Sequence, residues 1–274
     1  MLATALIRSS AVALALSFTA SGALAQAQRA PKAFEPEVGQ AGKDVVWVPT
    51  PQAVVDKMLE LAKVTKDDFL MDLGSGDGRT VITAAKRGAR ALGIEYNPDM
   101  VELSKRNAEA EGVSSRAQFQ KADLFQTDFS KATVVTVYLL PQLIGDLQPR
   151  FIATLKPGTR IVSHAFRMAG WRPDGSETLR LSGSHPGQGD ESTLYLWIVP
   201  ADVRGTWAGD GVRVRIEQNY QDVEIEGASG AVLKGAEISW QSPRGGFRGR
   251  VQGARIVGEL TVDGKTRAVT LRRR

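Results

Sequence analysis

Residues 69–79 read Phe-Leu-Met-Asp-Leu-Gly-Ser-Gly-Asp-Gly-Arg, and the predicted fold follows from this stretch. Phe69 to Leu73 predicts a short apolar strand with an acid near its end, and a run of glycines leads into a predicted helix from Thr80 to Arg87. Glycine adopts backbone torsions that other residues avoid and lets the chain approach a ligand closely. The first N–H groups of the helix have no partner within it. The stretch therefore predicts a cofactor site of the nucleotide type in an open α/β sheet.

The spacing of the glycines argues against a dinucleotide. A dinucleotide-binding loop reads Gly-x-Gly-x-x-Gly, whereas this loop reads Gly-x-Gly-x-Gly from Gly74, with Arg79 where the third glycine would fall. Asp72 and Asp77 flank and interrupt the loop, and carboxylates repel a pyrophosphate. These acids suit a ligand that carries an ammonium and a sulfonium charge. A purely structural turn is the alternative that the paired acids disfavour.

Two later strands also end in acids. Residues 91–95 predict a second apolar strand, and its last residue, Glu95, can accept hydrogen bonds from both hydroxyls of a ribose. Residues 117–124 predict a third strand, in which Asp123 can accept from an adenine amino group and Leu124 offers an apolar face to the ring. A surface carboxylate at a strand end explains either acid alone. Three successive strands that end in acids at the ligand-binding edge favour one site.

These residues together resemble the Rossmann-like class I methyltransferases that depend on S-adenosylmethionine. The resemblance covers roughly Val45 to Pro200 and implies an α/β sheet with helices on both faces. It implies that the glycine loop lies along the amino-acid end of the cofactor, that Glu95 holds the ribose and that Asp123 holds the adenine. The residues expected to bind the cofactor are Thr50, Asp72, Gly74, Ser75, Gly76, Asp77, Gly78, Glu95, Asn97, Asp123 and Leu124.

Short motifs narrow the resemblance. Val48-Pro-Thr-Pro51 precedes the first predicted helix, Gly93-Ile-Glu-Tyr-Asn-Pro98 follows the glycine loop, and Tyr138-Leu-Leu-Pro-Gln142 ends the fourth predicted strand. With the glycine loop, they resemble the lysine N-methyltransferases of the ATP synthase c-subunit and adenine nucleotide translocase type. This resemblance implies a lysine in a protein substrate, and specifically in a membrane protein. A small-molecule methyltransferase and a catalytically silent cofactor-binding protein are the alternatives.

Tyr138, Pro141 and Gln142 are the expected catalytic residues, because they lie at the carboxyl end of the fourth predicted strand, where the acceptor should approach. Tyr138 either lines the acceptor channel or is a buried structural residue. Pro141 and Gln142 either offer oxygens to the amine or, for Pro141, simply end the strand. Thr50 either closes over the cofactor or caps the helix that begins with Pro51.

Positioning and desolvation should carry most of the rate of such a transfer. Near-attack geometry supplies roughly 7–11 kcal/mol. A lysine ammonium must first lose a proton, which costs about 4 kcal/mol near neutral pH. A desolvated channel offsets that cost by lowering the pKa of the amine, so no strong general base is required.

The remaining elements follow from periodicity. Helices are expected at 52–63, 98–111 and 143–155, strands at 133–140 and 160–166, and an antiparallel pair at 178–181 and 192–199. His164 falls in a strand and His185 in a loop, and the chain has no cysteine, so no metal site is expected. His164 is expected to be a satisfied core residue and His185 a surface residue.

The N-terminus indicates export. Residues 1–25 combine one arginine, a short apolar run and Ala23-Leu-Ala25, which is typical of a cleaved signal peptide; an uncleaved inner-membrane anchor is the alternative. Residues 26–44 are then a flexible leader, and residues 45–200 the methyltransferase domain. A periplasmic or exported location conflicts with a cofactor made in the cytoplasm, and the sequence does not resolve this.

Residues 201–274 predict a small antiparallel all-β unit, with strands at 212–216, 220–225, 232–238, 247–251, 256–262 and 268–271. Its role is substrate recognition, attachment to a surface or passive stabilisation, and these alternatives stay open.

The whole chain of 274 residues has a net charge of +5, with arginine concentrated after Arg244. A solvated basic face explains this better than nucleic-acid binding, because no aromatic residues alternate with the arginines. Attraction to anionic lipids is a third interpretation, and the oligomeric state is not predicted.

Overall fold

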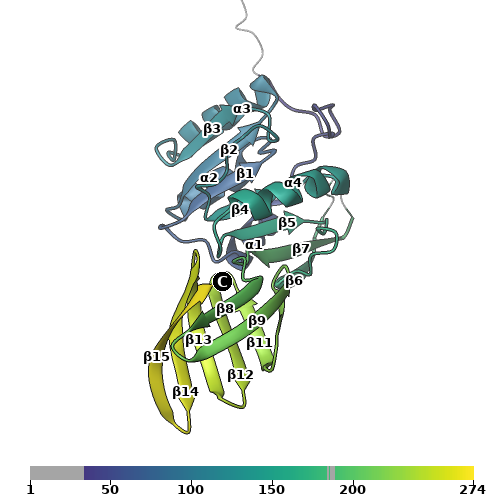
Figure 1. Ribbon diagram of the computed structural model, residues 1–274. Helices are drawn as coiled ribbons and strands as arrows, with labels where there is room; N and C mark the ends of the chain where they lie inside the picture. The colour runs from purple at the N-terminus through teal and green to yellow at the C-terminus, as the bar shows by residue number, and fades with distance from the viewer. Residues whose placement is uncertain (1–33, 184, 186–188) are drawn as a thin grey trace, which may run out of the picture. The chain divides into compact units, whose positions relative to one another are not determined.

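The acid-ended strand Phe69–Leu73 lies inside a mixed sheet in the computed structural model, which describes residues 34–183, 185 and 189–274. The strands of this first sheet are β1 (Phe69–Leu73), β2 (Arg90–Glu95), β3 (Ala117–Lys121), β4 (Val134–Val137), β5 (Arg160–His164), β6 (Gly175–Arg180) and β7 (Glu191–Ile198). They lie in the order β3-β2-β1-β4-β5-β7-β6 (Figure 1). Strands β1 to β5 pair in parallel, and β7 pairs antiparallel with both β5 and β6.

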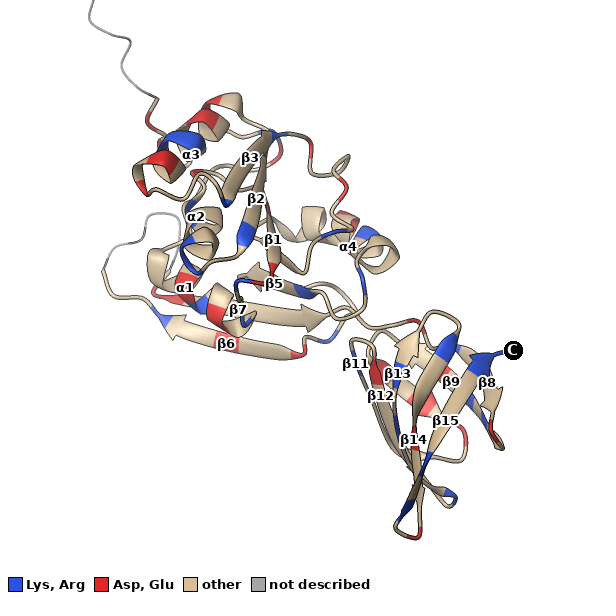
Figure 2. Ribbon diagram, turned by 90° about the vertical axis from the view of Figure 1, so that its left-hand side faces the viewer, with Lys and Arg blue, Asp and Glu red and all other residues tan. Residues whose placement is uncertain are grey.

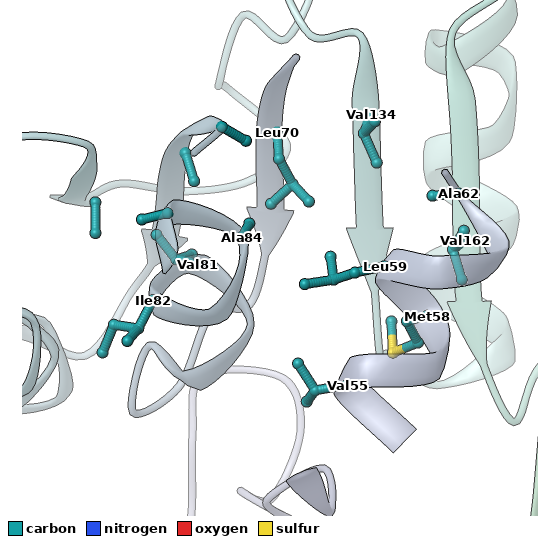
Figure 3. Close-up of a cluster of buried hydrophobic side chains, with 14 of the residues drawn as sticks. Val55, Met58, Leu59, Ala62, Leu70, Val81, Ile82, Ala84, Val134 and Val162 are labelled. Atoms are coloured by element: carbon teal, nitrogen blue, oxygen red, sulfur yellow. The ribbon is translucent and has the colours of Figure 1, made fainter. Parts of the chain in front are cut away.

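Helices cover both faces of this sheet, as the sequence predicts. The helices are α1 (Gln52–Leu61), α2 (Arg79–Lys86), α3 (Pro98–Ala110) and α4 (Pro141–Thr154). On one face, the buried residues of α1 and α2 pack on Leu70, Val134 and Val162, which point to the same side of three neighbouring strands (Figure 3). On the other face, Ile144, Leu147 and Phe151 of α4 pack on the alternate residues of those strands. This burial is what holds the carboxyl ends of the strands at one edge.

Two predicted limits that border the site are wrong, and one of the two alternatives for Thr50 is excluded. Strand β4 ends at Val137 rather than at residue 140, because the chain leaves the sheet there to start α4. Helix α4 begins at Pro141 rather than at residue 143, since a proline without an N–H fits the first helical turn. Thr50 does not cap α1: Pro51 occupies the cap position, and no side chain accepts a hydrogen bond there.

A second, antiparallel sheet follows in the C-terminal part of the chain. Its strands are β8 (Gly205–Gly209), β9 (Val212–Asn219), β10 (Asp222–Ile225), β11 (Ser229–Lys234), β12 (Glu237–Ser242), β13 (Gly245–Gln252), β14 (Arg255–Val262) and β15 (Lys265–Arg273). The sheet buries one face around Trp207, Trp240 and Phe247. Its strands carry charges of both signs, with arginines on β9 and β15 (Figure 2).

Two details of this sheet were not predicted. Strand β8 is absent from the expected set, since Gly205–Gly209 is too short and glycine-rich to show alternation. The single run expected at 232–238 is two strands, β11 and β12, which turn at Gly235 with a φ of +60°. A Cβ at Gly235 would lie 2.9 Å from the Cα of Gly158, so close approach of two backbone segments requires glycine here.

The expected signal peptide at residues 1–25 lies outside the described residues, as does the beginning of the expected leader. Residues 34–44 are described. The backbone N–H of Trp47 donates to the carbonyl of Gln40, and Ala41 bridges to Val46, which makes a short hairpin that the sequence did not predict. Residues 34–274 form one unit. Within the described residues, no helix is long and apolar enough to span a membrane.

Candidate active site

A cavity of about 340 Å³ opens at the carboxyl ends of β1, β2 and β4. All of the residues expected to bind the cofactor line it, except Gly78. Of the expected catalytic residues, Tyr138 lines the cavity. Pro141 and Gln142 do not line it, and both are exposed in the first turn of α4. The structure thus gathers the predicted acids at one edge, while the roles of these residues toward a cofactor remain predictions.

Strand β2 fixes the backbone of the glycine loop through hydrogen bonds. The backbone N–H groups of Gly74 and Ser75 both donate to the carbonyl of Ile94, at 2.9 and 3.0 Å. Gly74, Gly76 and Gly78 all have positive φ. A Cβ at Gly78 would lie 2.7 Å from Cε1 of Phe119 and 2.9 Å from Cβ of Ser104. Gly78 is therefore required for the packing of α2 rather than for a wall of the cavity.

Glu95 ties the loop to β2. One carboxylate oxygen, Oε2, accepts from the backbone N–H of Gly76 at 3.0 Å, and the other, Oε1, accepts from that of Asn97 at 2.9 Å. Asn97 caps α3 through its side chain, which accepts from the backbone N–H of Asp99. The carboxylate of Glu95 is thus oriented from both sides, and each of its oxygens keeps lone pairs for a ligand in the cavity that it lines.

Asp72 is the buried acid of the site. Its side chain accepts a hydrogen bond of 2.6 Å from the hydroxyl of Thr136 on the neighbouring strand. Burial raises the pKa of Asp72 to about 7, and the charges of Glu95 and Asp77 act in the same direction. A cationic ligand in the cavity would favour the ionised form of this carboxyl group.

Asp77 has a structural partner within the loop. Arg79 binds its carboxylate through Nε, at 3.0 Å from Oδ1, and through Nη2, at 2.5 Å from Oδ2. The same guanidinium donates from Nη1 to the carbonyl oxygen of Thr50, at 2.7 Å. Arg79 therefore joins the glycine loop to the Val48–Pro51 segment, which explains why an arginine, with its planar fork, stands after the last glycine.

Two residues of helix α3 donate hydrogen bonds to the backbone of the glycine loop, and neither was predicted from the sequence. The hydroxyl of Ser104 donates to the carbonyl of Gly76 at 2.8 Å, and Nδ2 of Asn107 donates to the carbonyl of Asp77 at 3.0 Å. Ser104 is fully buried. A small polar residue on the apolar face of a helix, with a second polar residue three positions later, is a signal that could have indicated them.

The hairpin at residues 40–47 forms a wall of the cavity. Lys43 binds Asp123 with Nζ 2.8 Å from Oδ2, and its ammonium lies 5.0 Å from the ring centroid of Tyr96. Trp47 lies against the loop, because a Cβ at Gly76 would fall 2.7 Å from its Nε1. The sequence did not predict this wall, since its contacts join segments that are far apart in the chain.

Tyr138 lies where the chain leaves β4. Its ring centroid is 4.1 Å from that of His164 and 6.4 Å from that of Phe166. Burial raises the pKa of the Tyr138 hydroxyl above its usual value.

The two histidines lie where the sequence predicts them. His164 is buried and hydrogen-bonded, as expected of a core histidine, and His185 contacts the carbonyl of Ser182 in its loop. Among the described residues, no cluster of acids, histidines or cysteines could hold a metal ion.

A cofactor with a ribose, an adenine and two positive charges fits this cavity. The carboxylates of Asp72, Glu95 and Asp123 are distributed along its walls. The hydroxyl oxygen of Ser75 is buried without a hydrogen-bond partner in the described part of the chain, in the loop where a ligand would lie. Positive φ at Gly74 and Gly76 brings the backbone close to that space.

Comparison with known proteins agrees with this geometry. Residues 72–175 match the family described as the ANTKMT methyltransferase domain. The chain is 43% identical, over 57% of its length, to a protein-lysine N-methyltransferase of Saccharolobus islandicus, and the match covers 94% of that protein. It is 34% identical, over 47% of its length, to the lysine N-methyltransferase of the ATP synthase c-subunit from Homo sapiens, of which it covers only 54%.

A solved structure is similarly related. The RNA methyltransferase from Salinibacter ruber, crystallised with S-adenosyl-L-homocysteine, is 48% identical to this chain, with a TM-score of 0.51. The match covers 57% of this chain and 96% of that one. The chain, which carries the glycine loop and the acids of the cofactor site, therefore belongs to the ANTKMT-type family of methyltransferases, enzymes whose cofactor is S-adenosylmethionine.

Proposed function

We propose that the protein transfers methyl groups to lysine side chains of a protein acceptor. The observation that carries this proposal is the 43% identity to the lysine N-methyltransferase of Saccharolobus islandicus across 94% of that protein. The cavity supports it, because an aromatic residue, Tyr138, lines the wall at the end of β4, where an acceptor side chain would enter.

The residues around Tyr138 suit a neutral amine. Tyr138, Leu139 and Phe166 line this part of the cavity, and none of these side chains is charged. An amine that enters an apolar environment is easier to deprotonate, because desolvation disfavours its charged form. When bound, S-adenosylmethionine supplies an electrophilic methyl group. The protein's part is then to desolvate the amine and hold it in line, which supplies roughly 7–11 kcal/mol without a strong base.

RNA is the second candidate acceptor, on one specific observation. The Salinibacter ruber protein that is 48% identical to this chain is described as an RNA methyltransferase. The absence of aromatic residues alternating with the C-terminal arginines favours a protein acceptor over RNA.

Transfer of a labelled methyl group would test the proposal. The purified enzyme is given labelled S-adenosylmethionine with a membrane-protein extract, with total RNA or with a small-metabolite extract, and mass spectrometry locates the product. We expect label on lysine in the protein fraction. Label on RNA or on a small metabolite alone would refute the proposal, and cofactor binding without transfer would identify a silent binding protein. Glu95→Ala, which removes the carboxylate that orients Gly76 and Asn97, is the negative control.

We infer from the N-terminal sequence that the enzyme is exported and that its acceptor is membrane-associated. Residues 1–25 support export, and the relative from Homo sapiens is named for a component of ATP synthase. The mature N-terminus, sequenced from protein purified from each cell fraction, tests this. A chain that begins at Gln26 outside the cytoplasm is expected, whereas an intact Met1 in the cytoplasmic fraction would contradict export.

A further inference from the structure

His164 is the last residue of β5, and it is only 1% exposed. Both of its ring nitrogens have hydroxyl neighbours: Nε2 lies 3.0 Å from Oγ of Ser192, and Nδ1 lies 3.4 Å from Oγ1 of Thr50. The carbonyl of Thr50 is in turn held by Arg79. The imidazole is therefore fixed by contacts with β7 and with the segment that precedes α1.

The register of the sheet places Tyr138 beside this ring. Val137 and Ser163 are the last paired residues of β4 and β5, which run in parallel. The next residues along the chain are Tyr138, just past the end of β4, and His164, the last residue of β5. Their ring centroids lie 4.1 Å apart, with 34° between the ring planes. Rings at this distance are in van der Waals contact, so the rigid imidazole restricts the orientation of the tyrosine.

Tyr138 faces the cavity, whereas His164 does not line it. Within the described residues, the hydroxyl group of Tyr138 makes no hydrogen bond to the protein. This oxygen is not one of the buried atoms that lack a partner, so it is open to solvent. The Tyr138 side chain is therefore not fixed by a hydrogen bond from its hydroxyl group. The orientation of its ring depends on the residues that pack against it.

The charge state of His164 suits a supporting rather than a chemical role. Burial lowers the pKa of His164 to about 4, so the ring is neutral at neutral pH. A neutral ring neither repels a positively charged methyl donor nor accepts a proton from an ammonium at this pH. Its contact with the ring of Tyr138 is a route by which it can affect the acceptor end of the cavity.

We propose that His164 is a positioning residue for methyl transfer: held by Ser192 and Thr50, its imidazole fixes the ring of Tyr138 at the acceptor end of the cavity. This inference rests on the proposed function, because it takes Tyr138 to border the path of the acceptor amine.

Two substitutions at His164 separate the parts of this arrangement. His164→Asn keeps a polar side chain but removes the ring, and His164→Phe keeps a flat ring but removes both hydrogen bonds. We expect His164→Asn to lower kcat at least tenfold and to leave the dissociation constant of S-adenosyl-L-homocysteine, measured by calorimetry, within twofold of the original value. His164→Phe should lower kcat less. His185→Asn, in a loop outside the cavity, is the matched control and should change neither quantity.

A double-mutant cycle tests whether the effect passes through the tyrosine. In a Tyr138→Ala background, His164→Asn should cost less than twofold in kcat, because the ring that it positions is gone. If His164→Asn lowers kcat by the same factor in both backgrounds, then His164 acts on the fold in general and the proposal is overturned.

A measurement without turnover completes the test. Nitration of tyrosines in the cofactor-free protein, mapped by mass spectrometry, should be several-fold faster at Tyr138 in His164→Asn, whereas Tyr96, which is 49% exposed, serves as the internal reference. An unchanged rate at Tyr138, with unchanged kcat, would refute the proposal. If the unsubstituted enzyme methylates no lysine at all, the proposed function fails separately, and the nitration rate still decides whether His164 holds Tyr138.

Discussion

Lys43 and Asp123, which are 80 residues apart in the chain, form an ion pair at the wall of the cavity, with Nζ 2.8 Å from Oδ2. The hydrogen bond from Lys43 lowers the pKa of Asp123, and the same bond raises the pKa of Lys43. The family resemblance assigns Asp123 to the adenine amino group. The ammonium of Lys43 therefore occupies a lone pair of the carboxylate that the cofactor should use.

Replacement of Lys43 should strengthen cofactor binding. The cofactor must compete with Lys43 for Asp123, and water screens an ion pair that is open to solvent, so Lys43 holds Asp123 only weakly. We expect Lys43→Gln to tighten the binding of S-adenosylmethionine by at most about fivefold, as measured by calorimetry. Lys131→Gln, which removes an exposed charge outside the cavity, should leave affinity unchanged. Weaker binding by Lys43→Gln alone would show that Lys43 contacts the cofactor instead of competing with it.

Gly93 should tolerate no side chain. A Cβ there would lie 2.5 Å from Oγ of Ser75 and 2.7 Å from Cδ1 of Phe119, so the glycine loop or β3 would have to move. Gly93→Ala should therefore destabilise the protein by about 1–3 kcal/mol and weaken cofactor binding, as shown by urea unfolding and calorimetry. Gly145→Ala is the control, because a Cβ at this helical position meets no atom within 4 Å. That variant should be unchanged or more stable by up to about 1 kcal/mol, and equal losses in both variants would contradict the steric argument.

The free energy of unfolding should depend on pH through two buried groups, Asp72 and His164, whose pKa values shift in opposite directions on folding. The pKa of Asp72 rises from 3.8 to about 7 on folding, so its contribution is present at low pH and is lost as pH rises toward 7. The pKa of His164 falls from 6.5 to about 4, so its contribution is present above 6.5 and is lost as pH falls toward 4. Each slope approaches about 1.4 kcal/mol per pH unit, and they oppose each other where the two windows overlap.

Single substitutions should expose each slope in urea unfolding across that overlap, from about pH 4 to 6.5. Relative to the unsubstituted protein, the free energy of unfolding of Asp72→Asn should increase with pH, because the opposing His164 slope remains. That of His164→Phe should decrease with pH, because the Asp72 slope remains. Parallel curves for all three proteins would show that neither group changes its pKa on folding.

Tyr220 should couple the C-terminal sheet to the methyltransferase part. Its ring stacks on Trp171, with 5.0 Å between centroids, and its hydroxyl accepts from Nε2 of Gln148 on α4 at 2.8 Å. Tyr220→Ala should lower the free energy of unfolding by about 2–4 kcal/mol, and Tyr220→Phe, which keeps the stack, by about 1 kcal/mol. Urea unfolding of the full chain measures both. A Tyr220→Ala protein as stable as the original would show that the contacts of Tyr220 do not couple the two sheets.

The local sequence was sufficient to predict the strand, the glycine loop and the helix at the centre of the site. A strand, a glycine loop and a helix are adjacent in the chain at residues 69–87, and their geometry depends on torsions and hydrophobic periodicity that each segment carries itself. The same reasoning placed Glu95 and Asp123 at the same edge, since the carboxyl ends of parallel strands must meet there. Pro141 and Gln142 lie in the first turn of α4 and do not line the cavity. The sequence did not predict this position, because a proline after a strand can end that strand or begin the next helix; the catalytic role of the two residues stays a prediction.

The sheet, the glycine loop and the acids around the cavity could be predicted from the order of the amino acids, because those features depend on neighbours within a few residues or on the repeating order of strands and helices. The contacts of those groups could be seen only in the folded chain: Lys43 binds Asp123, Arg79 binds the carbonyl of Thr50, and His164 packs on Tyr138. Each of these pairs depends on strand register or on the path of a hairpin. Such contacts are set by packing across the whole unit, which no local pattern encodes.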